Sequence, residues 1–259
     1  MNIVVCIKQV PDTTEVKLDP KTGTLIREGI PSIINPDDKG ALELALQLKD
    51  KYGAHVTVLT MGLPQADAAL REALAMGVDR AILLTDRKLG GADTLATSRA
   101  IAGALRQIDF DLILAGRQAI DGDTAQVGPQ IAEHLGLPQV SYLLDLEVNG
   151  KNCRVKKSTE EGYQILETEM PCVFTVLSTA NKARYMTVNG IVEAYNREVE
   201  IWNADKTGTD ENLLGLKGSP TRVFKSFTKA LKPAGETYEV SPEEAVDLII
   251  SKLKEKFII

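Results

Sequence analysis

Apolar and polar positions alternate along roughly the first 135 residues in a way that predicts repeated strands and helices. Short β-branched runs are typical of strands buried on both faces, and broad apolar faces at helical spacing are typical of covering helices. The expected strands are residues 3–7, 55–60, 81–84 and 112–115, and the expected helices begin at residues 36, 65, 93 and 128. This repeated alternation predicts an α/β fold with a doubly wound, mainly parallel sheet.

Capping residues support the predicted helix ends. Asn35 precedes Pro36 and is expected to cap the first helix, and Asp93 or Thr94 is expected to start the third. Gly77 is expected to end the second helix in a left-handed conformation, and Gly136 is expected to close the fourth.

The pattern changes after the fourth helix. Residues 142–148, 153–157, 163–169 and 172–176 read as strands with short turns, including Asn149-Gly150, and predict an antiparallel extension of the same domain. From about residue 181 the chain becomes irregular, and it ends in an amphipathic helix over 242–257. We therefore expect an α/β nucleotide-binding domain at 1–180, then a partner-recognition loop and C-terminal partner-binding arm at 181–259. A flexible tail is the alternative, but Trp202, Phe224 and Phe227 offer apolar anchors.

Composition excludes several classes of function. The net charge of -6 and an aromatic content of 5% give no support to nucleic-acid binding. The apolar runs are too short to cross a membrane, and the N-terminus reads as a strand instead of a signal peptide, so we expect a cytoplasmic protein. Cys6, Cys153 and Cys172 lack metal-site spacing, and the two histidines lie far apart, so no metal site is expected.

The densest candidate chemistry is the segment 116–128, which lies between a predicted core strand and a helix. Ligands of open α/β sheets bind at strand carboxyl ends, and free N–H groups at helix N-termini attract phosphates. Gly116 and Gly122 would let backbone approach a ligand closely, and Thr124 and Gln126 offer side-chain donors. Asp121 and Asp123 would repel a phosphate, so we expect them to cap the helix or hold the loop. An ordinary polar loop is the alternative.

Other strand ends are expected at the same crevice, namely the segments 6–8, 35–37 and 60–62. Thr94, Thr97 and Ser98 could direct hydroxyls there, although N-capping is an equal explanation for such residues. The sequence contains no recognisable nucleophile–base pair, since neither histidine sits in a loop with a suitable partner. Chemistry, if present, is expected to come from a cofactor.

Several segments together resemble the beta subunit of an electron-transfer flavoprotein. The loop AGRQAIDGDTAQVGPQIAEHLGLP resembles the family's nucleotide-binding loop, and VVCIKQVPD, INPDDKGALELALQLK and REALAMGVDRAILL extend the likeness over almost the whole chain. The family's signature region appears at residues 155–173, with Glu161 and Phe174 departing from the usual residues. The resemblance implies an adenine nucleotide alpha hydrolase-like fold and a heterodimer with a flavin-carrying alpha subunit.

The resemblance also implies a cofactor and its contacts. The implied cofactor-binding residues are Cys6, Asn35, Pro36, Asp37, Met61, Gly62, Asp93, Thr94, Thr97, Gly116, Arg117, Gln118, Ala119, Ile120, Asp121, Gly122, Asp123, Thr124, Ala125, Gln126 and Val127. The run GADTLATS at 91–98 is similar to electron-bifurcating members, in which the ligand is FAD and NADH delivers hydride. Ordinary members hold structural AMP instead, and that alternative stays open. Arg117 could place positive charge near a flavin ring.

The implied partners follow from the same likeness. In bifurcating members one electron goes to ferredoxin or flavodoxin, and the other goes through the alpha-subunit FAD to an acyl-CoA dehydrogenase. The segment 183–190, including the loop Arg184 to Gly190, resembles the loop that recognises the dehydrogenase, with Val188 as its apolar anchor. Glu193 stands where a lysine is often found. A stand-alone nucleotide-binding regulatory module is a third hypothesis, but its Gly-rich loop is absent.

Overall fold

The computed structural model describes residues 1–12, 31–224 and 235–259, which form two units, Met1–Phe224 and Lys225–Ile259. The strands are β1 (Asn2–Ile7), β2 (Gln9–Pro11), β3 (Ser32–Ile34), β4 (His55–Met61), β5 (Arg80–Leu84), β6 (Leu112–Gly116), β7 (Gln139–Asn149), β8 (Asn152–Thr159), β9 (Gly162–Glu169), β10 (Cys172–Val176) and β11 (Glu200–Trp202). The α-helices are α1 (Pro36–Tyr52), α2 (Asp67–Met76), α3 (Thr94–Leu105), α4 (Val127–Leu135), α5 (Val188–Asn196) and α6 (Pro242–Glu255).

The main sheet has nine strands in the order β11-β5-β4-β1-β6-β10-β7-β8-β9. All neighbours from β11 to β7 are parallel, which confirms the doubly wound α/β prediction. The chain moves outward from β1 through β4 to β5, and then returns through α3 to β6 on the other side of β1. The topological switch point therefore lies between β1 and β6, where ligands of such sheets bind.

Helices cover both faces of the parallel sheet. Val5, Ile7 and Val58 belong to a core cluster shared with α1 and α2. Cys6 and Leu59, one residue further along each strand, belong to a second cluster shared with α3 and α4. Because side chains alternate across a strand, these two clusters are the opposite faces of one sheet. Such two-sided burial explains why the strands read as continuous apolar runs.

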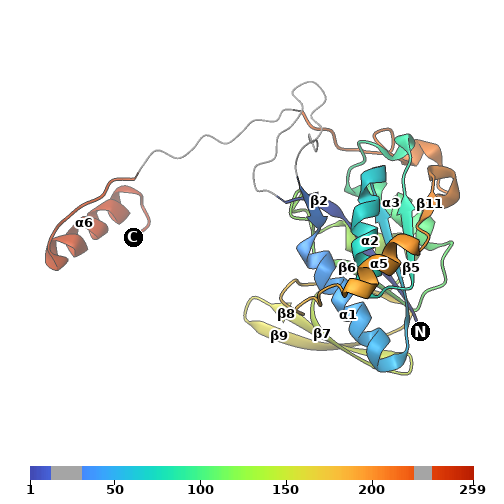
Figure 1. Ribbon diagram of the computed structural model, residues 1–259. Coiled ribbons are helices and arrows are strands. Elements are labelled where there is room, and N and C mark those ends of the chain that lie inside the picture. The colour runs from blue at the N-terminus through green and yellow to red at the C-terminus, as the bar shows by residue number, and fades with distance from the viewer. Residues whose placement is uncertain (13–30, 225–234) are drawn as a thin grey trace. The chain divides into compact units, whose positions relative to one another are not determined.

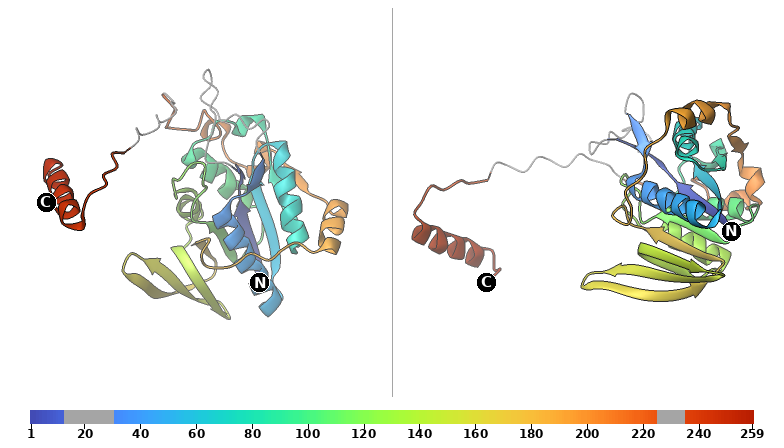
Figure 2. Two further views of the ribbon diagram at one scale, coloured as in Figure 1. Left: turned by 60° about the vertical axis from the view of Figure 1, so that its left-hand side comes forward. Right: turned by 60° about the horizontal axis from the view of Figure 1, so that its bottom comes forward.

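The antiparallel extension differs in part from the sequence prediction. β7, β8 and β9 pair antiparallel and extend to one side of the parallel sheet (Figure 2). β10, which was expected in this extension, instead inserts between β6 and β7 and runs parallel to both. Its five residues are all buried, as an interior strand requires.

The helix ends follow the predicted residues with one correction. Gly77 has φ 120° and ψ 16°, so it ends α2 at positive φ, and Gly136 ends α4 in the left-handed region. Asp93 caps α3 by accepting a hydrogen bond from the Ala96 N–H. Asn35 occupies the N-cap position of α1, but its side chain makes no capping hydrogen bond. Its amide is used elsewhere.

Residues after 180 pack differently from the C-terminal partner-binding arm that the sequence predicts. Helix α5 lies against α2 (Figure 1), and β11 pairs with β5, so this part of the chain adds to the first unit. Trp202 is buried as expected, but Phe224 is fully exposed and anchors nothing within the described chain. Phe227 lies outside the described residues, and so does the hairpin turn that the sequence DPKTG predicts at residues 19–23. The second unit carries α6, which begins with a capping box at Ser241 and Glu244.

Candidate functional site

The candidate site lies at the switch point, where the loop 117–126 connects the end of β6 to α4. The end of β1 is the neighbour of β6 in the sheet, with Cys6 in register with Ala115. The N-terminus of α1 and the N-terminus of α3 both bond to this loop, as described below. The structure therefore brings three of the predicted segments together at one edge.

Asp38, on the first turn of α1, joins the two strand ends. Its carboxylate accepts hydrogen bonds from the Lys8 N–H at 2.7 Å and from the Gly116 N–H at 2.9 Å. Burial raises the pKa of Asp38 to about 7, against the lowering effect of these bonds. The carboxylate thus links the end of β1 to the end of β6.

Gly116 is a glycine for an internal reason. A Cβ at this position would lie 2.2 Å from the Asp38 Oδ1 and 2.6 Å from the Asp38 backbone nitrogen. The close approach that we expected toward a ligand is therefore an approach of β6 to α1. Gly122 differs, because a Cβ there meets nothing within 4 Å.

Asn35 fixes the loop through two side-chain hydrogen bonds. Its side chain is completely buried; its Nδ2 donates to the Gln118 carbonyl at 2.8 Å, and its Oδ1 accepts from the Ile120 N–H at 3.0 Å. Both functional groups of the amide therefore serve the protein. A nucleotide contact through this side chain would have to compete with two buried hydrogen bonds.

Both loop aspartates accept hydrogen bonds within the protein, and Asp121 is also paired with a cation. Asp121 accepts from the Lys8 Nζ at 2.6 and 2.8 Å, and Asp123 accepts from the Gln118 Nε2 at 2.8 Å. Neither one caps α4, whose N-cap residue is Gln126. Of the two expected roles, holding the loop is confirmed.

A run of N–H groups at the end of the loop has no acceptor. Asp123 and Ala125 have φ 50° and 52°, unusual values for residues with a side chain. Among the described residues, the backbone N–H groups of residues 124–128 make no hydrogen bond of any kind. Alternating left-handed residues with free N–H groups form concave anion-binding surfaces. The segment thus has the local geometry of a phosphate-binding loop.

Buried polar atoms without partners lie at the same edge. The Asp37 Oδ2 and the Arg117 Nε lie 3.2 Å apart, but the pair lacks hydrogen-bond geometry. The Thr60 Oγ1, near the end of β4, is buried without a partner among the described residues. Because buried polar groups are nearly always hydrogen-bonded, these atoms are available to a ligand or to water.

Helix α3 reaches the loop through its first residue. The Thr94 Oγ1 donates to the Gln126 Oε1 at 2.9 Å, so the two predicted segments meet. Asp93 directs its carboxylate to the Ala96 and Thr221 N–H groups and the Thr221 hydroxyl. The prediction that Ser98 directs its hydroxyl to the crevice is wrong. Ser98 is fully buried, and its Oγ lies 3.1 Å from the His134 Nε2.

The Ser98–His134 contact is not the nucleophile–base pair that the sequence analysis found missing. The Ser98 hydroxyl donates to the Leu95 carbonyl at 2.9 Å, which leaves no proton for the imidazole to accept. Burial and the nearby Arg99 and Arg106 lower the pKa of His134. The pair joins α3 to α4 and is not arranged as a nucleophile and base.

The remaining predicted residues occupy the edge without bonding to the loop. Cys6 and Met61 face the α3 and α4 side of the sheet, and burial raises the pKa of the Cys6 thiol to about 12. The Gly62 N–H donates to the Leu84 carbonyl at 3.1 Å. Pro36 is the first residue of α1, and Thr97 lies in the first turn of α3. Their contact with a cofactor stays a prediction.

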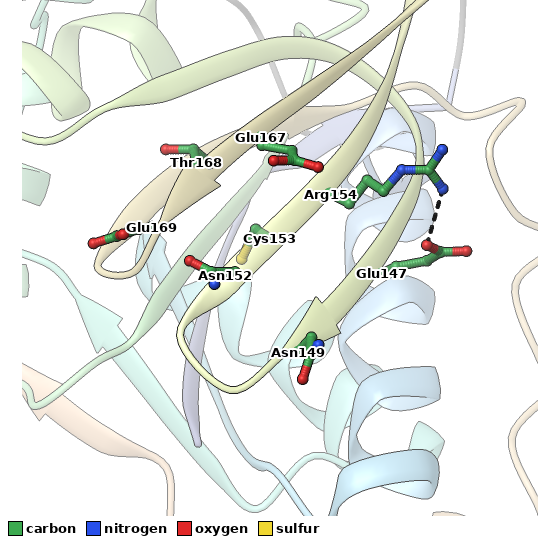
Figure 3. A pocket seen from close by; sticks show the side chains of 8 residues that line it. All are labelled: Glu147, Asn149, Asn152, Cys153, Arg154, Glu167, Thr168 and Glu169. Carbon is green, nitrogen blue, oxygen red and sulfur yellow. Dashed lines mark hydrogen bonds and ion pairs between the residues drawn. The ribbon is translucent and has the colours of Figure 1, made fainter.

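A hollow of about 470 Å³ lies elsewhere, on the antiparallel strands (Figure 3). It is lined by Glu147, Asn149, Asn152, Cys153, Arg154, Glu167, Thr168 and Glu169. Arg154 and Glu147 form an ion pair of 3.1 Å across β8 and β7. None of the predicted site residues lines this hollow, so we assign it no part in nucleotide binding.

Two residues of the site were missing from the predicted set. Lys8 neutralises Asp121, and Asp38 bridges the strand ends. The available signals in the sequence were a lysine directly after a buried strand and a second aspartate after a helix-starting proline. Neither signal identified a partner, because the partners lie 113 and 78 positions away.

Over the described parts of the chain, no group of histidine, cysteine and acidic side chains is arranged to hold a metal ion. The three cysteines there are free and buried. No helix of these parts has the length and apolar character needed to cross a membrane.

The fold defines a doubly wound α/β protein, and its candidate site lies at the carboxyl ends of the strands. A family model described as the electron transfer flavoprotein domain matches residues 22–207. The chain is 58% identical over 259 residues to the electron transfer flavoprotein subunit beta of Clostridium acetobutylicum, with 100% of each chain covered. It therefore belongs to the electron-transfer flavoprotein family, as the sequence resemblance indicated.

Two further relatives match over 100% of each chain. Subunit CarD of the caffeyl-CoA reductase–Etf complex of Acetobacterium woodii is 52% identical over 262 residues. The acryloyl-CoA reductase electron transfer subunit gamma of Anaerotignum propionicum is 46% identical over 268 residues. Both relatives are named as parts of CoA reductase systems.

Proposed function

We propose that this chain is the beta subunit of a heterodimeric electron-transfer flavoprotein and that it binds FAD at the β1/β6 switch point. The observation that carries the proposal is the run of five N–H groups at residues 124–128, which includes the uncapped start of α4 and has no acceptor in the part of the chain that the structure describes. Such a run suits the phosphates of a dinucleotide. The proposed site consists of the predicted cofactor-binding residues, with Lys8 and Asp38 as supports.

Local charge fits an anionic ligand. Asp121 is paired with the Lys8 ammonium, so its carboxylate adds little repulsion near the N–H groups of residues 124–128, and Gln118 holds the Asp123 carboxylate by a hydrogen bond. Arg117 lies at the start of the loop with its side chain partly exposed. A cation so placed would favour negative charge on a bound phosphate or flavin ring.

Two observations support FAD over the smaller AMP. The α3 N-terminus, with Thr94 and Thr97, adjoins the loop through the Thr94–Gln126 hydrogen bond and extends the edge beyond the phosphate loop. Full-length relatives above 45% identity include subunits of CoA reductase systems. A bound FAD would supply two-electron hydride acceptance from NADH and single-electron release.

The residues of this chain would orient that cofactor without taking part in bond making. Asn35 and Lys8 hold the loop, and the loop N–H groups would neutralise the phosphates. Because the parallel sheet and four helices form the base of the site, the loop is supported on rigid elements.

The proposed partners are the flavin-carrying alpha subunit, ferredoxin or flavodoxin, and an acyl-CoA dehydrogenase. In the proposed scheme one electron passes to ferredoxin or flavodoxin, and the other passes to the alpha-subunit flavin and on to the dehydrogenase. The three free, buried cysteines of the described chain suit the reducing cytoplasm that we propose as the setting.

The proposed dehydrogenase contact is the loop Arg184 to Gly190 and the start of α5. Val188 is 82% exposed, which suits an apolar anchor. Arg184 instead points its guanidinium at Glu43 and Asp50, at 2.9 and 2.8 Å, and so fixes the loop to α1. Glu193 accepts from the Asn189 Nδ2 at 2.9 Å, one turn earlier on α5.

The direct test is to co-express the chain with its alpha partner, denature the purified complex and count the released nucleotides. We expect two FAD per heterodimer. One FAD and one AMP would overturn the bifurcating assignment but keep the beta-subunit role. A complex with a single nucleotide in total would overturn the proposed site itself.

A further inference from the structure

A segment far along the chain lies against the start of α3. Residues 215–221, which we call the strap, follow the last short helix of the first unit. The Leu216 N–H donates to the Gly90 carbonyl at 3.0 Å, and a Cβ on Gly215 would lie 2.1 Å from the Lys88 carbonyl oxygen. This contact brings two backbones together, and at Gly215 only glycine allows such an approach.

The strap accounts for much of the hydrogen bonding of Asp93. The Thr221 hydroxyl and N–H both donate to the Asp93 Oδ2, at 2.8 and 3.1 Å. The Asp93 N–H donates to the Ser219 Oγ at 2.8 Å, and the other carboxylate oxygen caps α3 through the Ala96 N–H at 3.0 Å. These bonds outweigh the effect of burial and lower the pKa of Asp93.

Asp93 is joined in turn to the candidate phosphate loop. The next residue, Thr94, donates its hydroxyl to the Gln126 Oε1 at 2.9 Å. Gln126 lies within the run of free N–H groups at 124–128. A continuous series of contacts therefore leads from Thr221 through Asp93 and Thr94 to the loop.

We propose that Thr221 is a positioning residue of the nucleotide site, acting through Asp93, Thr94 and Gln126. The proposal rests on the proposed function, because it assumes that the loop binds a nucleotide. It gives Asp93 a role other than direct cofactor contact, since its carboxylate serves the strap and the helix cap.

The physical reason for this role is charge. Asp93 adjoins the residue that bonds to the loop, where a phosphate would be close to its carboxylate. Two donors from Thr221 hold the Asp93 Oδ2 in place and partly neutralise it. Without the Thr221 hydroxyl, the Asp93 carboxylate would keep its charge but lose the shorter of its two hydrogen bonds to Thr221. The less constrained carboxylate would then repel the phosphate.

The test uses the purified heterodimer with its alpha partner. Thr221→Val removes the hydroxyl and keeps the backbone N–H, while Thr221→Ser keeps both donors. Thr207→Val is the matched control, because the Thr207 hydroxyl donates to the Ala204 carbonyl at 2.7 Å and has no bond to Asp93. Each complex is measured for its melting temperature and for the rate at which the beta-site nucleotide dissociates, with the alpha-site flavin as internal reference.

We expect Thr221→Val to speed dissociation by about tenfold, near the lower end of the effect of losing one hydrogen bond to a charged group, because Thr221 acts on the loop through other residues. Thr221→Ser should restore the rate, and Thr207→Val should lower the melting temperature without changing the rate. Ser219→Ala, which removes the acceptor of the Asp93 N–H, should act in the same direction as Thr221→Val.

Two distinguishable results would overturn the proposal that Thr221 positions the nucleotide site. An unchanged dissociation rate in Thr221→Val, with a melting temperature that falls as in Thr207→Val, would make Thr221 purely structural. A wild-type complex without any beta-site nucleotide would overturn the proposed function together with this role.

Discussion

The Lys8 Nζ donates to both carboxylate oxygens of Asp121, over 2.6 and 2.8 Å, and so ties the end of β1 to the loop that follows β6. The Asp121 side chain is only 10% exposed, whereas that of Lys8 is 42% exposed. The pair is therefore partly open to solvent, and we expect it to contribute less to folding than to the charge of the loop.

Changing Lys8→Met should weaken beta-site nucleotide binding by about tenfold, because Asp121 would face the phosphates without its counter-charge. The free energy of unfolding should change by less than about 1 kcal/mol, as is usual for a pair that solvent reaches. Nucleotide titration and chemical denaturation of the complex measure the two effects.

Two further variants isolate the charge. Lys8→Met combined with Asp121→Asn should recover most of the affinity, since the repelling carboxylate is then gone. Lys39→Met breaks another 2.6 Å ion pair, with Glu72, and should leave nucleotide binding unchanged. Equal loss in both lysine variants would show that the effect is not local.

Two glycines of the candidate site should respond in opposite ways. Gly122→Leu should deplete the beta-site nucleotide and leave folding almost unchanged, because a Cβ there meets nothing within 4 Å. Gly116→Ala should destabilise the fold by about 2–4 kcal/mol, because its Cβ would overlap Asp38. Nucleotide content and unfolding midpoints distinguish the two. A Gly122→Leu complex with both sites full would mean that the phosphate loop is misplaced.

Asp38 should make stability depend on pH. Its pKa is raised by burial from 3.8 to about 7, so folding favours the protonated carboxyl. The contribution of Asp38 to the free energy of unfolding is therefore fully present below about pH 4 and is lost as the pH rises through about 7. The free energy of unfolding of the wild type, minus that of Asp38→Asn, should fall between those pH values. A difference that stays constant over this range would contradict the raised pKa.

The variant itself has a predictable cost. Asparagine offers one acceptor where aspartate offers two, so either the Lys8 or the Gly116 N–H loses its partner. We expect this lost bond to cost Asp38→Asn about 1–3 kcal/mol at neutral pH and above, where the ionised wild-type carboxylate can accept both bonds.

Val188→Asp should abolish binding of the proposed dehydrogenase partner and leave the nucleotide content unchanged. The side chain is 82% exposed, so the substitution removes an apolar contact surface without disturbing the core. Ile201→Asp, at a 63% exposed residue on β11, is the control for adding a charge to the surface. Turnover with the dehydrogenase, measured at rising partner concentration, reads out the effect. Normal turnover in Val188→Asp would refute the assignment of this loop.

The strand-to-helix alternation was enough to predict the parallel sheet, its switch-point loop and most helix ends. Local rules sufficed there, because burial on two faces imposes continuous apolar runs and glycine ends a helix at positive φ. The same local rules misassigned β10, because a five-residue, mostly apolar run after a hairpin does not specify which neighbours it pairs with.

The roles of the site's polar residues required the tertiary structure. Asn35 has the sequence position of a helix cap, yet its amide bonds to Gln118 and Ile120, more than 80 positions away. Asp93 caps its helix as predicted, but only the fold shows that Thr221 shares the carboxylate.

The sequence alone thus determined the family, the class of fold and the place of the loop along the chain. The tertiary structure decided which carboxylates are neutralised and which N–H groups stay free, because those hydrogen bonds join residues that are distant in sequence and meet only at the edge of the folded sheet.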